Sequence, residues 1–114
     1  MAMVDMSVPQ VHFRDIKPYF APDSLDALSG PDGGVIKLPK RVFWVPGDGR
    51  VDLDRPGGTA LAYETLLQEA DAELQEQLIN RRRLIEIWPE LVLPLRVRRL
   101  WEDRFPQLMA LAAA

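Results

Sequence analysis

The sequence predicts a small α+β domain, mainly α, in which an N-terminal arm and a short β-hairpin precede three or four packed helices. Three observations predict this fold class. Prolines and glycines interrupt residues 1–34, β-branched and aromatic residues gather in 35–53, and the spacing of apolar residues becomes helical from Thr59 onward. With 114 residues the chain has the length of one domain. We therefore expect a single compact domain at 35–108, between the arm at 1–34 and an alanine-rich tail at 109–114.

The arm contains one segment with helical character. The run SLDALSG predicts a single short helical turn, with Ser24 or Asp23 as its N-cap and Gly30 as its stop. The rest of the arm is expected to be extended or loose. The rings of Tyr19 and Phe20 are large enough to tether it to the body of the domain.

Residues 35–53 have the composition of β-strands. The apolar runs 35–38 and 42–45 come first, and a short third run at 51–53 follows the turn sequence PGDG. Asp-Gly between two such runs is typical of a hairpin, so the sequence predicts that 42–45 turns back on 51–53. The prolines after the first two runs lack a backbone donor, so these strands are expected to be short or at an edge.

From Thr59 the pattern is that of an amphipathic helix, with apolar residues at steps of three and four. Asp54 is a candidate N-cap for this helix, with Pro56 in its opening turn. Asp71 is placed to cap a second helix and so to split the stretch near Ala70. The apolar stripe comprises Tyr63, Leu66, Leu67, Ala70, Leu74 and Leu78.

Prolines divide the C-terminal third into further helices. Pro89 is expected to push Trp88 out of helical geometry and so to end one helix there. Pro94 suits the first turn of a last helix, and Pro106 is expected to stop that helix. Trp88 and Trp101 each fall on the apolar face of a separate helix, which favours a place in the core. The expected core anchors are Trp44, Tyr63, Leu67, Trp88 and Trp101.

Residues suited to catalysis are scarce. Ser-His-Asp catalysis needs a histidine beside a nucleophile, and the single His12 lies in the proline-rich arm. Asp48, Asp52 and Asp54 are close together but lack the spacing and the distal glutamate of a Ca²⁺ loop, which favours turn and cap roles. The glycine runs match neither nucleotide-binding fingerprint. We expect a protein that is not an enzyme, without catalytic, cofactor-binding or metal-binding residues.

Composition also bears on location. The chain has no cysteine, no apolar run of about 20 residues and no signal-peptide pattern at its start. We therefore expect a cytoplasmic protein that has no membrane partner.

Charge is unevenly distributed along the chain. Residues 56–80 carry five acidic and no basic side chains, whereas 81–114 carry seven basic and four acidic ones. These segments either attract each other within the fold or offer a surface to a protein partner. The net charge of −3 and the apolar junction WPELVLPL disfavour a helix-turn-helix DNA-binding protein, although nucleic acid stays open as a partner. The candidate partner-binding residues are Glu64, Glu69, Asp71, Glu73, Glu76, Arg81, Arg82, Arg96, Arg98 and Arg99.

The stretch 24–108 resembles a family of small actinobacterial proteins that typically lie beside a nucleotidyltransferase-like toxin of the abortive-infection E class. The resemblance extends over a dense set of positions. These are Leu38, Pro39, Trp44, Asp52, Leu53, Pro56, Tyr63, Glu64, Leu67, Glu69, Leu84, Trp88, Leu91, Leu93, Pro94, Arg98, Trp101 and Glu102. The sequence departs from the family pattern at RPGGTAL, where glycines replace better helix formers, and at ADAELQEQ.

The resemblance implies a non-enzymatic, antitoxin-like protein that binds and neutralises a cognate toxin. It implies no catalytic residue and no cofactor. The acidic stretch 64–76 is a candidate cover for the basic active-site rim expected of such a toxin, although a solvated helix face accounts for the same acids. Two other functions stay open: a small DNA-binding regulator that uses the arginines of 81–99, and an interaction or scaffold module without a toxin partner.

Overall fold

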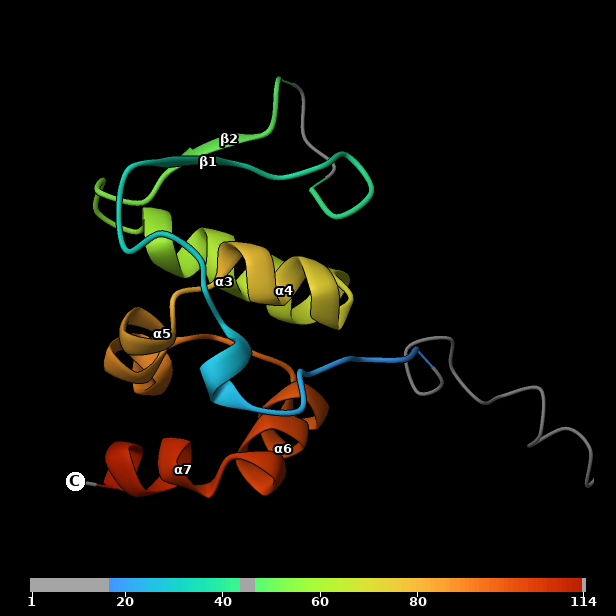
Figure 1. Cartoon of the computed structure of the whole chain (residues 1–114), viewed down its shortest axis with the longest axis vertical. Helices are drawn as coiled ribbons and strands as arrows, with labels where there is room; N and C mark the ends of the chain where they lie inside the picture. The colour runs from blue at the N-terminus through green and yellow to red at the C-terminus, as the bar shows by residue number, and fades with distance from the viewer. Residues whose placement is uncertain (1–16, 44–46, 114) are drawn as a thin grey trace, which may run out of the picture.

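The computed structural model describes residues 17–43 and 47–113, with side chains described as far as residue 109. Two residues singled out in the sequence, His12 and Trp44, lie outside the described residues. The predicted fold class is confirmed: within the described residues a two-stranded antiparallel hairpin precedes five α-helices (Figure 1). In chain order the elements are the 3-10 turn η2 (Leu25–Ala27), β1 (Val35–Lys37), β2 (Arg50–Asp52), α3 (Gly58–Glu69), α4 (Ala72–Leu78), α5 (Arg81–Ile87), the 3-10 turn η3 (Trp88–Glu90), α6 (Leu95–Arg104) and α7 (Pro106–Ala113).

The elements form three levels along the long axis of the molecule (Figure 1). The hairpin lies at one end, α3 and α4 lie in the middle, and α5, α6 and α7 lie at the other end. None of the helices in the described part of the chain is both long enough and apolar enough to cross a membrane.

The hairpin pairs different segments from those predicted. Val35 lies opposite Asp52 and Lys37 opposite Arg50, so the partner of β2 is β1 and not 42–45. The prediction was wrong because residues 40–42 form a turn, which the Val42 N–H closes on the Pro39 carbonyl at 3.0 Å. The observed register places the apolar residues Ile36 and Val51 together on the buried face of the hairpin.

Residues 17–30 contribute to the core. The predicted helical turn is confirmed as η2, and the Ser24 hydroxyl caps it by accepting the Asp26 N–H at 3.0 Å. Leu25 and Leu28 are buried on either side of this turn, so it is anchored by apolar packing. The turn ends at Leu28 rather than at Gly30.

Gly30 instead allows two backbone segments to approach each other closely. Its N–H donates to the Ile79 carbonyl at 2.9 Å, and its neighbour Ser29 forms an isolated β-bridge with Asn80. A Cβ atom on Gly30 would lie 2.2 Å from the carbonyl carbon of Leu78, so only glycine fits at this crossing.

The boundary between α3 and α4 is as predicted. Ala70 ends α3, and Asp71 caps α4 by accepting the Leu74 N–H at 2.9 Å. The predicted cap of α3 is wrong. Gly57, in the left-handed region with φ of 79°, precedes the helix, and the Asp54 carboxylate instead accepts the Gly34 N–H at 3.0 Å. The local turn at Gly57 therefore leaves Asp54 free to tie the helix entry to the start of β1.

Pro89 acts differently from the prediction, whereas Pro106 follows the end of α6 as predicted and also opens a further helix. Trp88 keeps helical dihedral angles, with φ −49° and ψ −46°, because Pro89 follows as the second residue of η3 instead of ending the helical path. Pro106 opens α7 rather than marking the end of helical structure, although α6 does end just before it. As a result, α7 spans the expected boundary between the domain and its alanine-rich tail.

Four of the five predicted core anchors are described, and all four are buried: Tyr63, Leu67, Trp88 and Trp101 each show 0% exposure. The two tryptophan rings lie 6.3 Å apart, and the Trp101 ring lies 5.4 Å from that of Phe105. Both distances are in the range of favourable aromatic contacts, so an aromatic cluster joins η3 to α6.

Candidate protein-binding surfaces

The predicted acidic residues of α3 are engaged with other parts of the chain. The Glu64 carboxylate accepts the Val92 N–H at 2.8 Å and so ties α3 to the loop before α6. Glu69 forms an ion pair with Lys17 at 2.8 Å. These carboxylates therefore hold the fold together as well as facing solvent.

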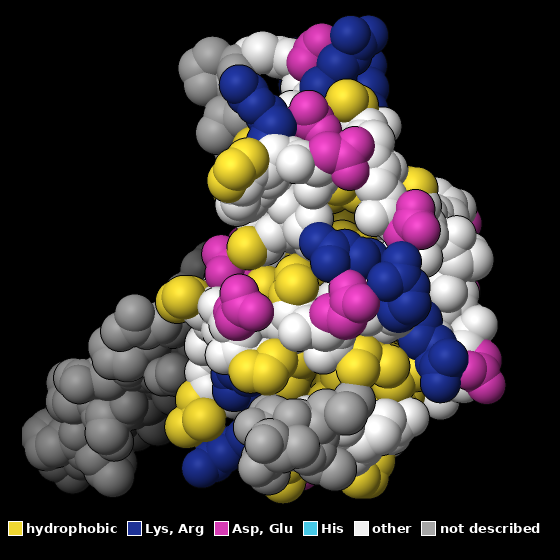
Figure 2. Space-filling view, turned by 90° about the vertical axis from the view of Figure 1, so that its left-hand side faces the viewer, with side chains coloured by type: hydrophobic (Ala, Val, Ile, Leu, Met, Phe, Trp, Pro, Cys, Tyr) yellow, Lys and Arg dark blue, Asp and Glu magenta, His cyan; other side chains and the backbone are white. Residues whose placement is uncertain are grey.

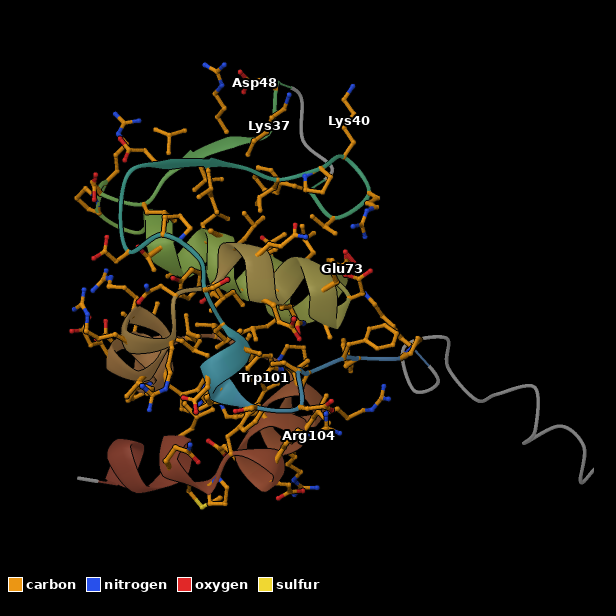
Figure 3. All side chains as sticks on the ribbon, in the orientation of Figure 1. Lys37, Lys40, Asp48, Glu73, Trp101 and Arg104 are labelled. Carbon is orange, nitrogen blue, oxygen red and sulfur yellow. The ribbon has the colours of Figure 1, made fainter. Side chains whose placement is uncertain are left out.

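The acidic residues at the start of α4 are more available. Asp71 lies 4.0 Å from Arg41, at the limit of an ion pair. The carboxylates of Glu73 and Glu76 make no bond with the residues that the structure describes, and Glu73 is exposed (Figure 3). Where acids of α3 and α4 form ion pairs, their partners are Lys17 and Arg41, so the N-terminal half of the chain supplies the opposite charge.

The arginines at the start of α5 form a mixed-charge face. Arg81 pairs with Asp26 at 3.4 Å, and Arg82 pairs with Asp32 at 3.3 Å and with Glu86 at 3.0 Å. Figure 2, which views the side of the molecule where α5 lies, shows basic side chains interleaved with acidic ones. The hydrogen bond from Arg83, together with the charges of Arg82 and Arg83, lowers the pKa of Glu86. The positive charge of this face is thus largely neutralised by acidic side chains of the same chain.

Arg98 is partly buried against the core. Its guanidinium lies 5.1 Å from the centre of the Trp88 ring, donates to the carbonyls of Trp88 and Leu91, and lies 3.7 Å from the Glu102 carboxylate. Glu102 in turn accepts the Trp88 indole N–H at 2.9 Å. The side chain of Arg98 is only 24% exposed, and its hydrogen bonds hold Trp88 and the loop before α6 in position.

The other two candidate arginines of α6, Arg96 and Arg99, do not combine with Arg98 into one basic face. Arg96 donates to the Lys17 carbonyl at 2.9 Å and lies over the Tyr19 ring at 5.0 Å. Arg99 is exposed and bonds to none of the residues that the structure describes. A DNA-binding face would need several such free arginines side by side.

The structure also forms a surface that the sequence patterns do not predict, a groove between the hairpin and the outer face of α3. Its larger part has a volume of about 530 Å³ and its smaller part about 370 Å³, and Phe43 lines both. From α3 the groove receives Leu61, Thr65 and Gln68, which share one helix face. We call this surface the α3 groove. One signal was present in the sequence: Leu61 falls outside the predicted apolar stripe, and it is 46% exposed.

Charged residues lie at both ends of the α3 groove. Arg50 and Arg55 line the end beside the start of α3, where the helix carries no side-chain cap. Arg50 is paired with Asp48 at 3.2 Å. Arg41 and Glu69 line the other end, next to the acidic start of α4. Asp52 lines the first end together with the two arginines, so the groove has mixed charge at both ends and apolar residues between them.

The aspartates considered for a metal site are used in turns. Asp48 accepts the Arg50 N–H at 3.1 Å, and Asp52 accepts the Asp54 N–H at 2.9 Å. Within residues 17–43 and 47–113 no cluster of three or more acidic or histidine side chains is arranged to hold a metal ion.

Comparison of the chain with protein-family models, with curated proteins and with solved structures finds no match.

Proposed function

We propose that this protein acts by binding another protein, as an antitoxin-like inhibitor of a cognate nucleotidyltransferase-like toxin in the cytoplasm. The partner class is the one that the resemblance of residues 24–108 implies. The observation that carries the binding function is the α3 groove, in which a half-exposed leucine and Phe43 lie between charged ends.

The chemistry of the groove suits a protein segment. Apolar side chains that fill pockets provide most of the binding energy at protein interfaces, and the surrounding polar contacts orient the partner. Leu61 and Phe43 offer apolar contact, while Thr65 and Gln68 offer hydrogen-bonding groups along the same helix face.

The acidic start of α4 adds an electrostatic component. Asp71 and Glu73 follow directly on the end of the groove that Glu69 lines. An enzyme that acts on nucleotides or RNA is expected to have a basic rim around its active site. Opposite charges on the two surfaces would accelerate association and would select the partner.

Co-expression with the nucleotidyltransferase-like toxin that the proposal requires tests it. The two proteins are expected to co-purify, and this chain is expected to relieve the growth arrest that the toxin causes. Leu61→Lys places a charge in the groove and should weaken the complex about thirtyfold, the effect of losing a central interface residue, as measured by titration calorimetry.

Val92→Lys is the matched control, because Val92 is 79% exposed and lies in the loop before α6, away from the residues that line the groove. Its complex should retain the affinity of the unmodified chain. Failure of both co-purification and relief of growth arrest would disprove the proposed function. Salt-sensitive binding of the chain to its own promoter, without toxin binding, would point instead to the DNA-binding alternative.

A further inference from the structure

The hairpin has two outer edges, and the hydrogen-bond register determines which backbone groups point outward from each edge. The Leu53 N–H donates to Gly34 and the Leu38 N–H donates to Gly49, so these pairs exchange ladder bonds within the hairpin. Antiparallel pairs alternate between bonded and non-bonded positions. The backbone groups of Val35 and Lys37 in β1, and of Arg50 and Asp52 in β2, therefore point outward from the two edges.

Local contacts close the edge of β2. The outward N–H of Arg50 donates to the Asp48 carboxylate at 3.1 Å, and the outward carbonyl of Asp52 accepts the Arg55 N–H at 3.2 Å. Gly58 also lies against that carbonyl, since a Cβ atom there would come within 1.9 Å of it. Two of the four outward backbone groups of β2 are thus already bonded, and the start of α3 lies against this edge, which disfavours a further strand here.

The edge of β1 is open. Among the described residues none bonds to the outward backbone groups of Val35 and Lys37. The strand β1 lies at one end of the molecule (Figure 1). The Val35 side chain is 59% exposed, and Lys37 is exposed. An open strand edge of this kind is a template for pairing with another extended chain.

The charge beside this edge is positive. Figure 3 shows Lys37 and Lys40 on the outer side of the hairpin, away from the helices. Asp48 lies on the same side, where it forms an ion pair with Arg50. Neither ammonium group makes an ion pair with a described residue. Pairing between two copies of β1 would bring these lysines from both chains together, which electrostatic repulsion disfavours.

We propose that the outer edge of β1 binds an extended acidic segment of a protein partner by strand addition. The segment adds as a third strand, exchanges backbone hydrogen bonds with Val35 and Lys37, and places carboxylates beside Lys37 and Lys40. This site is distinct from the α3 groove, because residues of β2 and none of β1 line that groove. It does not depend on the identity of a toxin.

A synthetic fluorescein-labelled peptide of alternating Glu and Val tests the proposal with the full chain alone. Its binding is measured by fluorescence anisotropy, and the ¹⁵N spectrum of the chain identifies the contacted amides. We expect the largest shifts, and slowed hydrogen exchange, at the amides of Val35 and Lys37. A peptide of alternating Lys and Val should not bind.

Two variants separate the roles of charge and backbone. Lys37→Glu retains every backbone group and is expected to weaken peptide binding about tenfold, because an attractive cross-strand pair becomes repulsive. Val35→Pro removes an outward donor that the hairpin itself does not use, and it should weaken binding further if the variant folds. Arg99→Glu, on α6, is the matched charge control and should bind like the unmodified chain.

Other outcomes overturn the proposal. Equal binding by the Lys37→Glu variant, or shifts confined to the α3 groove, would place the peptide elsewhere. Concentration-dependent shifts of the β1 amides without peptide would identify a second copy of this chain as the occupant. Displacement of the peptide by a single-stranded oligonucleotide at lower concentration than by unlabelled peptide would identify nucleic acid instead.

Discussion

At the scale of single residues, Tyr63 both packs in the core and accepts a hydrogen bond there. It is fully buried, and its hydroxyl accepts the Asn80 N–H at 3.0 Å. Burial raises the pKa of Tyr63 above its ordinary value of 10.0, because the phenolate would lose its hydration. The protonated form is therefore the one that the folded state holds. Its stabilising effect is complete below the unfolded pKa and is lost as pH rises toward the folded pKa.

Tyr63→Phe tests this dependence on pH. At about pH 8 the variant should lose about 1 kcal/mol, because the Asn80 N–H no longer has its acceptor. At about pH 10.5 ionisation of Tyr63 favours the unfolded state of the unmodified chain but not of the variant, so the difference between the two proteins should shrink. Urea unfolding at both pH values measures this change. A difference that does not depend on pH would contradict the burial effect.

Residue by residue, the sequence predicted those features that local chemistry decides. Asp71 caps the helix that it was expected to cap, and Trp88 and Trp101 are buried as expected. Of the two residues considered as the cap of the N-terminal turn, Ser24 is the one that caps it. The sequence did not predict Arg98, which looks like a surface charge on an amphipathic helix. Its partly buried position depends on Trp88 and the loop carbonyls, which only the tertiary fold brings within reach.

At the scale of elements, the start of α3 is determined by its contact with β2. Gly57 adopts a left-handed conformation, and Gly58 follows with its Cα against the Asp52 carbonyl. The Thr59 hydroxyl donates to the Leu53 carbonyl at 2.9 Å and fixes the same junction. In the sequence these glycines look like poor helix formers. In the fold their lack of a side chain allows the helix to begin directly beneath the hairpin.

Gly58→Ala is a direct test of this junction. Inside an exposed helix such a change would stabilise by about 1 kcal/mol through helix propensity. Here the added Cβ would lie 1.9 Å from the Asp52 oxygen, so we expect a net loss of about 1–3 kcal/mol in urea unfolding. A gain in stability would show that the strand and the helix are not held this close. Ala60→Gly, two residues along the helix, reports the propensity effect together with the loss of one partly buried methyl group.

The hairpin and α7 show why element boundaries were harder to predict than element types. Runs 35–38 and 42–45 have similar composition, and the choice between them depends on which apolar residue faces α3 alongside Val51. Pro106 is compatible with either ending or opening a helix. The burial of Leu108 on the neighbouring elements favours the second outcome. The α3 groove was beyond prediction for the same reason, since it exists only where the hairpin loop lies beside the helix.

At the scale of the whole molecule, the C-terminal helix belongs to the cooperative fold. Leu108 has 0% exposure and lies in the same apolar cluster as Trp88 and Trp101. Met109, its neighbour, is 50% exposed. Substitutions of these two adjacent residues are therefore expected to change the free energy of unfolding by very different amounts.

Leu108→Ala should lower the free energy of unfolding by about 2–4 kcal/mol, because it removes buried methyl groups and leaves a cavity. Met109→Ala should change it by less than about 0.5 kcal/mol. Urea unfolding followed by tryptophan fluorescence measures both variants. Equal small effects would show that 106–113 is attached loosely and does not contribute to the stability of the core.

The bridge between Ser29 and Asn80 has a consequence for how the chain reaches this structure. The Asn80 amide also donates to the Gly30 carbonyl, a contact between residues 50 positions apart. Bringing such distant positions together costs chain entropy that the helices from 58 to 104, built on near-neighbour contacts, do not incur. We therefore expect the N-terminal segment to dock last, onto a core that the helices have already begun to form.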